Sequence, residues 1–183
     1  MTEIVQLKVT LMGTKPPVWR RILVPSSVSL LDLHAILQET MGWENYHMFE
    51  FSKGKQRFGV IDEEFGDDEL IDAGKIPLSA IISKPKDKFR YTYDFGDNWE
   101  HELVVEKFLP EEKEKTYPVC IEGMMNCPPE DCGGIPGYYH LLEVLTNKRS
   151  KEHKEMLERV GGAFNPEHFD LPLVNASLEE LAH

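Results

Sequence analysis

The stretch IVQLKVTLM, residues 4–12, alternates between apolar and polar side chains, with Val5, Leu7, Val9 and Leu11 on one side. A period of two residues is typical of a half-buried strand. The following GTKPP, residues 13–17, predicts a turn, because proline presets its backbone angle and glycine tolerates unusual angles. With a second strand over residues 18–24, this stretch predicts an antiparallel hairpin.

The apolar period changes from two to 3.6 directly after this hairpin, which favours a helix. Ser29 is suited to cap the first turn, and Gly42 fits the position just past the last one. We therefore expect a helix that begins near Ser29 and includes residues 30–41. The order hairpin, helix, strands resembles a β-grasp (ubiquitin-like) arrangement. The apolar stripe of this helix consists of Leu30, Leu33, Ile36 and Leu37.

The rest of the chain predicts more antiparallel strands and then helices. Strands are expected in four segments: 48–60, 89–95, 99–107 and 117–121. Helices are expected at 138–146 and 150–160, with further starts at Asn165 and Ser177. Strands followed by helices favour an α+β fold with an antiparallel or mixed sheet and C-terminal helices. A length of 183 residues fits one domain, 1–183.

Acidic residues outnumber basic ones, with 32 Asp and Glu against 20 Lys and Arg and a formal net charge of −12. Proteins that bind nucleic acid usually carry a basic face, because counterion release from phosphates drives their affinity. We therefore do not expect direct DNA binding, although a small basic patch around Lys15, Arg20 and Arg21 stays open.

The expected cellular location follows from the absence of targeting and membrane-spanning segments in the sequence. The N-terminal residues 1–13 have neither a basic segment nor a long apolar run, so no signal peptide is expected. No stretch approaches the roughly 20 apolar residues of a membrane-spanning helix. Three cysteines do not indicate a disulfide framework. We expect a cytoplasmic protein with no membrane partner.

Two further stretches have unusual composition: YDFGDNWEH, residues 93–101, and CPPEDCGG, residues 127–134, which leads to Gly137-Tyr138. Together they resemble the plasmid pRiA4b ORF-3-like family. The resemblance covers most of the chain, from residues 5–9 through 17–21 to 169–170, and does not include Cys127 and Cys132. It implies no established activity. Some relatives look like passenger genes of mobile elements, which implies an accessory role in mobile-element biology.

The residues of these two stretches allow plain structural roles as well as functional ones. Asp97 is suited to bond its own backbone in a hairpin turn, and His101 is suited to be a satisfied strand residue, a ligand or a proton carrier. The loop after Cys127 cannot be regular structure, because prolines and glycines interrupt it. It is suited to cap the following helix or to hold an anion. We expect the two stretches to pack together and form a binding site from Asp94, Asp97, Trp99, His101, Glu130, Asp131 and Tyr138.

A metal site is a further hypothesis. The spacing of Cys127 and Cys132 lies within the range of structural zinc pairs, whereas that of Cys120 and Cys127 does not. With His101, the three cysteines could form a zinc site. The first functional hypothesis is a non-enzymatic binding or interaction module for an unknown protein or small molecule. The alternative is a metal-dependent hydrolase that uses Asp94, Asp97, His101, Glu130 and Asp131.

Overall fold

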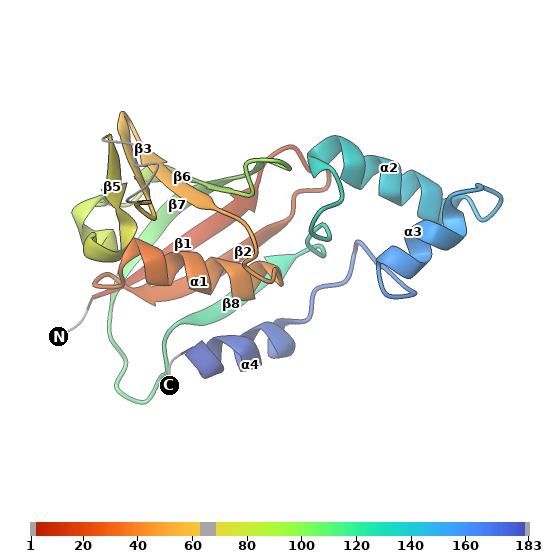
Figure 1. Ribbon diagram of the computed structural model, residues 1–183. Helices are drawn as coiled ribbons and strands as arrows, with labels where there is room; N and C mark the ends of the chain where they lie inside the picture. Colours follow the sequence, from red (N-terminus) through yellow and green to blue (C-terminus); the bar gives the residue numbers. More distant parts are fainter. Residues whose placement is uncertain (1–2, 63–68, 182–183) are drawn as a thin grey trace.

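A mixed eight-stranded sheet and four α-helices make up the described residues, 3–62 and 69–181, of a computed structural model (Figure 1). The strand order is β5-β4-β3-β6-β7-β1-β2-β8, and only β4 and β5 pair in parallel. The strands are β1 Glu3–Leu11, β2 Trp19–Pro25, β3 Phe49–Lys53, β4 Gln56–Gly59, β5 Leu70–Asp72, β6 Lys88–Tyr93, β7 Trp99–Pro110 and β8 Val119–Met124. The helices are α1 Leu30–Met41, α2 Gly134–Thr146, α3 His153–Arg159 and α4 Leu171–Leu181.

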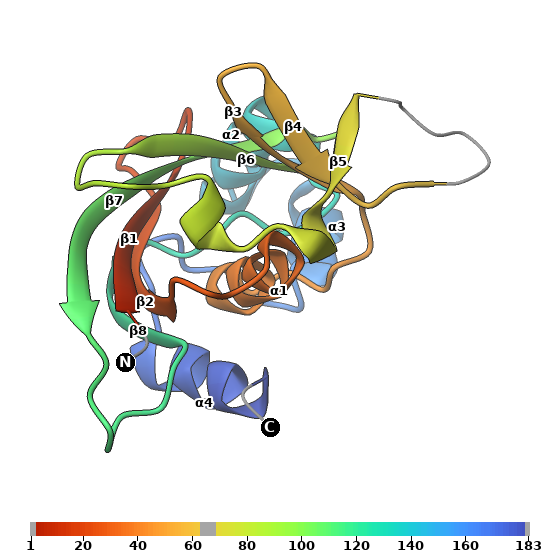
Figure 2. The same ribbon diagram turned by 90° about the vertical axis from the view of Figure 1, so that its left-hand side faces the viewer.

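Helix α1 lies in the hollow of the curled sheet, as Figure 2 shows. Ser29 caps its first turn by accepting a hydrogen bond from the Asp32 backbone N–H at 3.0 Å. Gly42 ends it in the left-handed conformation, with φ 81°. Leu30, Leu33 and Leu37 are fully buried. The predicted hairpin and helix are therefore confirmed.

The central pairing of the sheet was not evident from the sequence. β1 lies antiparallel to β2 on one side and to β7 on the other. The β-grasp likeness is not confirmed, because that arrangement places a later strand parallel to the first. The α+β class with a mixed sheet holds.

The C-terminal helices differ in their limits from the prediction. α2 begins at Gly134, four residues before the predicted start, and no described helix begins at Asn165. Asp170 caps α4 instead, by accepting from the Leu173 N–H at 3.0 Å. Ser177 therefore lies inside α4 and caps nothing. None of the described helices combines the length and the apolar character needed to cross a membrane.

Asn175 of α4 covers the outer edge of β8. Its Oδ1 accepts from the Cys120 N–H at 2.8 Å, and its Nδ2 donates to the Cys120 carbonyl at 2.9 Å. The amide thus makes the two bonds that another strand would make, which protects an edge that would otherwise invite pairing.

We expect Asn175→Ala to lower the free energy of unfolding by about 1–3 kcal/mol, because two backbone groups lose their partners. Urea denaturation measures this loss. Glu179→Ala, an exposed change on the same helix, is the control and should stay within about 0.5 kcal/mol of the parent protein. Equal stability of both variants would contradict the role of Asn175.

Candidate functional site

Backbone pairing between β3 and β6 brings the loop after α1 beside the end of β6. Phe49 pairs with Tyr93, and the Asp94 N–H donates to the Met48 carbonyl at 2.9 Å. Asp94 then leaves the strand with φ 54°. His47, one residue before Met48, is consequently held next to the Asp94 side chain.

The loop of residues 127–133 is tied to the same place by three hydrogen bonds. The Trp43 indole N–H donates to the Pro128 carbonyl at 2.9 Å. The Tyr93 hydroxyl donates to Glu130 Oε1 at 2.5 Å, and the Glu44 N–H donates to Oε2 at 2.8 Å. Burial, followed by the Glu130 carboxylate, raises the pKa of Tyr93 well above its usual value, so the phenol stays a donor. Glu130 therefore anchors the loop.

Asp97 joins the hairpin turn to the start of α2. Its Oδ2 accepts from the Gly133 N–H at 3.0 Å, and an added Cβ at Gly134 would lie 2.4 Å from the Asp97 carbonyl oxygen. The two stretches that the sequence singled out are thus in direct contact. We call this contact between residues 97 and 133–134 the seam.

A cluster of three ligand-type side chains lies beside the seam. His47 Nε2 is 3.0 Å from Asp131 Oδ1 and 3.7 Å from Asp94 Oδ2, and the three ligand atoms lie within 4.8 Å of one another. Asp94 is buried and Asp131 is exposed. Asp94 Oδ1 accepts from the Gly96 N–H at 2.9 Å, which leaves Oδ2 to face His47. We call these residues the triad.

The triad has the composition and size of a cation site. Bonds of about 2.0–2.2 Å place neighbouring ligand atoms roughly 3–4 Å apart. A spread of at most 4.8 Å is only slightly wider, so small side-chain rotations would close it around an ion. One imidazole and two carboxylates suit zinc or manganese.

The structure buries several residues that the sequence marked as candidates. Trp99 and His101 are 0% exposed, and Tyr138 is 3% exposed. His101 lies at the edge of the Trp43 ring, 5.4 Å between centroids, and burial lowers its pKa to about 4. These three side chains lie in the core and do not reach the surface of the protein.

The expected zinc ligands are not gathered into one group. Among the described residues, the triad is the one set of three or more ligand-type side chains within reach of a common ion, and it contains neither His101 nor a cysteine. Cys120, Cys127 and Cys132 are free thiols. Burial raises the pKa of Cys127 and of Cys132 to about 12, so both thiols are protonated at neutral pH when no metal is bound.

His47 was missed because nothing in its local sequence marks it. It stands in an irregular loop, and only the pairing of β3 with β6 brings it to Asp94. Asp94 and Asp131 were expected at the site and are found there, each with φ 54°. The positive φ turns both residues away from the path of the chain before them.

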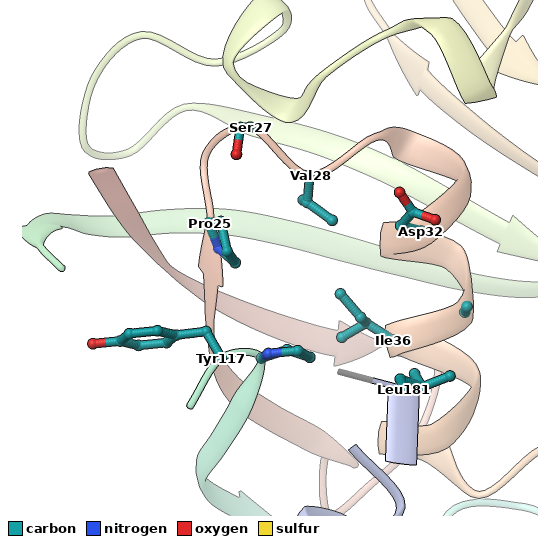
Figure 3. A pocket seen from close by; sticks show the side chains of 9 residues that line it. Pro25, Ser27, Val28, Asp32, Ile36, Tyr117 and Leu181 are labelled. Carbon is teal, nitrogen blue, oxygen red and sulfur yellow. The ribbon is translucent and has the colours of Figure 1, made fainter. Parts of the chain in front are cut away.

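Another hollow, of about 270 Å³, lies between α1, the residues before it and the end of α4. Figure 3 shows Val28, Ile36 and Leu181 around it, whereas the Tyr117 ring extends away from α1. Its wall is largely apolar, and the Asp32 carboxylate already accepts a hydrogen bond from the Ser29 hydroxyl at 2.7 Å. It offers no converging ligand atoms of the kind that the triad has.

The basic patch that the sequence left open is largely neutralised. Arg20 is 2% exposed, and its Nε donates to the Thr40 carbonyl at 3.1 Å. Arg21 forms ion pairs with Glu106 and Glu122. Neither guanidinium is available for phosphate groups.

One family model and two similar proteins match most of this chain. The family model described as plasmid pRiA4b ORF-3-like protein matches residues 3–172. The uncharacterized protein y4hQ of Sinorhizobium fredii is 38% identical over 184 residues, covering 100% of this chain and 94% of that protein. A crystal structure of MM3350 from Methanosarcina mazei Go1, described as a protein of unknown function, superposes with a TM-score of 0.85 at 35% identity. The match covers 94% of this chain and 97% of that one.

Proposed function

This chain belongs to the plasmid pRiA4b ORF-3-like family, and we propose that it is a non-enzymatic binding module that holds a divalent cation between His47, Asp94 and Asp131. The observation that carries the proposal is the convergence of these three side chains, from three separate segments, within 4.8 Å. We further propose that the protein is cytoplasmic, that it has an accessory role in mobile-element biology and that it does not bind DNA directly.

The other polar side chains that the sequence marked as candidates form hydrogen bonds within the protein or are buried, which favours binding over catalysis. Both carboxylate oxygens of Glu130 accept hydrogen bonds from the protein, and one of those of Asp97 accepts from Gly133. His101 is fully buried. A general base must reach the proton that it removes, and these residues are held in structural roles.

A metal-dependent hydrolase is the second candidate, supported by one feature of the triad. Catalytic zinc sites keep three protein ligands and an open position for water, and the triad also supplies three. The discriminating measurement is hydrolysis of simple ester and phosphoester substrates by the zinc- or manganese-loaded protein. Turnover that depends on both the metal and Asp131 would favour the enzyme.

We expect the metal-free protein to bind about one zinc or manganese ion, as measured by calorimetry. His47→Asn and Asp131→Asn should each weaken binding at least about tenfold, since even residues outside the first ligand shell affect affinity by that factor. Binding should also weaken as pH falls, because a ligating imidazole must release its proton.

His140 and Glu152 provide matched controls for these two changes. They form another exposed histidine–carboxylate pair, at 3.0 Å, away from the triad. His140→Asn and Glu152→Gln should leave metal affinity unchanged. A parent protein that binds no divalent ion, or variants that all bind equally, would refute the proposed cation site.

A further inference from the structure

A pocket of about 330 Å³ adjoins the triad, and His47 lies in its wall. A volume near the lower end of ligand pockets suits a small organic molecule. The same imidazole thus belongs to the triad and to a hollow that can admit a ligand. The lining residues are Leu31, His34, Asn45, His47, Met48, Phe49, Val60 and Asp62.

The mouth of this pocket is apolar and exposed. Leu31, Met48 and Val60 line it and are 40%, 59% and 53% exposed. Ile61, next to Val60, and Tyr46, between the lining residues Asn45 and His47, are exposed as well. Exposed apolar side chains that gather around a hollow mark a binding surface more often than single scattered ones do. The mouth therefore suits a ligand with an apolar body.

A relay of hydrogen bonds fixes the polar floor. Gln38 Oε1 accepts from the Asn45 N–H at 3.1 Å, and Gln38 Nε2 donates to the Tyr91 hydroxyl at 2.8 Å. Since Asn45 Oδ1 can only accept, the neutral His34 ring carries its proton on Nε2, and Nδ1 accepts from the Tyr91 hydroxyl at 2.7 Å. His34 Nε2–H then donates to Asn45 Oδ1 at 2.7 Å. Each of the four residues in the relay thus takes part in two of these bonds.

The relay leaves one donor for a ligand. The Asn45 Nδ2 group has no acceptor within residues 3–62 and 69–181, and its orientation is set by the His34 ring. That ring is stacked on Phe49 at 3.7 Å between centroids. Burial lowers the pKa of His34 to about 4, so the ring is neutral and the relay persists at neutral pH. A fixed amide donor in a pocket wall is suited to an acceptor such as a carboxylate.

We propose that this pocket binds a small monocarboxylate with an apolar body, held at its carboxylate by the cation of the triad and by the Asn45 amide. This inference rests on the proposed cation site. A cation with three protein ligands keeps open coordination positions. Asp62, Asp94 and Asp131 would repel a carboxylate in the absence of the cation, so the ligand binds after the cation.

The test is calorimetry with a series of carboxylates, namely acetate, phenylacetate and 4-phenylbutyrate, with and without zinc. Phenylacetamide is the neutral control. We expect at least one aromatic acid to bind the zinc-loaded protein. The same acid should bind at least tenfold more weakly when zinc is absent. Acetate and phenylacetamide should bind the zinc-loaded protein more weakly than that acid does. Asn45→Asp and Met48→Gln should each weaken acid binding at least fivefold while zinc still binds. Leu173→Gln replaces an exposed apolar residue on α4 and should alter neither zinc binding nor acid binding.

The outcomes separate this inference from the proposal on which it rests. If zinc binds and no acid of the series does, the inference is wrong and the cation site stands. If zinc does not bind, the cation site and the inference both fail. If an acid binds equally without zinc, or no better than phenylacetamide, the cation does not hold the carboxylate and the inference is overturned.

Discussion

The protein is expected to lose about 3 kcal/mol of stability for each of two buried histidines as the pH falls from about 7 to about 4. His34 and His101 are 3% and 0% exposed, and burial lowers the pKa of each to about 4. In the unfolded chain both titrate near the ordinary value of about 6.5. The unfolded state therefore binds more protons throughout this interval, so acid favours unfolding.

The sign and the pH window follow from these values. The stability that the neutral histidines confer is complete above about pH 6.5, decreases between about pH 6.5 and 4, and has been lost below that. Carboxylates with lowered pKa, such as Asp87 and Glu106, add their own losses at lower pH. Urea denaturation at several pH values through this window measures the slope. A total of about 6 kcal/mol for the two histidines would be a large part of a typical free energy of unfolding.

His101→Phe separates the histidine effect from a general acid effect. His101 Nε2 is buried without a hydrogen-bond partner in the described structure, so the change removes an unsatisfied polar atom and a titrating group together. We expect the slope between about pH 6.5 and 4 to fall by about half. A parent protein equally stable at about pH 7 and 4.5 would contradict the prediction.

Local patterns predicted the first part of the fold well, because each signal and its consequence lie within a few residues. The change in period near Ser29 located α1, and Ser29 and Gly42 do cap it. Strand order could not be predicted, since the pairing of β1 with β7 joins residues that are at least 90 positions apart in the sequence. The start of α2 was missed because glycine residues in a sequence indicate a loop and not a helix. The helix nevertheless begins at Gly134, and both Gly133 and Gly134 have a positive φ.

The sequence predicted the contact between the two stretches, but only two of the three residues of the triad beside it. A loop without regular structure needs partners for its backbone groups, and this argument correctly placed residues 127–134 against the hairpin. Which side chains face outward depends on the backbone at the end of β6. His101 follows the alternation of β7 into the core, whereas Asp94 turns out of the strand. His47 enters through a strand pairing that no local pattern announces.

Gly134→Ala is expected to have the second large effect, a loss of at least about 3 kcal/mol in the free energy of unfolding. An alanine Cβ would lie 2.4 Å from the Asp97 carbonyl oxygen, and that oxygen belongs to the backbone of a turn, which cannot rotate away as a flexible side chain can. The residue also has φ 65°, which L side chains rarely adopt. The seam must open, and Asp131 must move with it.

Gly54→Ala isolates the conformational part of this cost. Gly54 has nearly the same φ, 61°, and nothing within 4 Å of an added Cβ. It should cost only about 1–2 kcal/mol and leave zinc affinity unchanged, because only backbone strain is added. Gly134→Ala should cost more in urea denaturation and also weaken zinc binding, since the seam holds the loop that carries Asp131. Equal losses of stability in the two variants would show that the close approach at the seam does not constrain the fold.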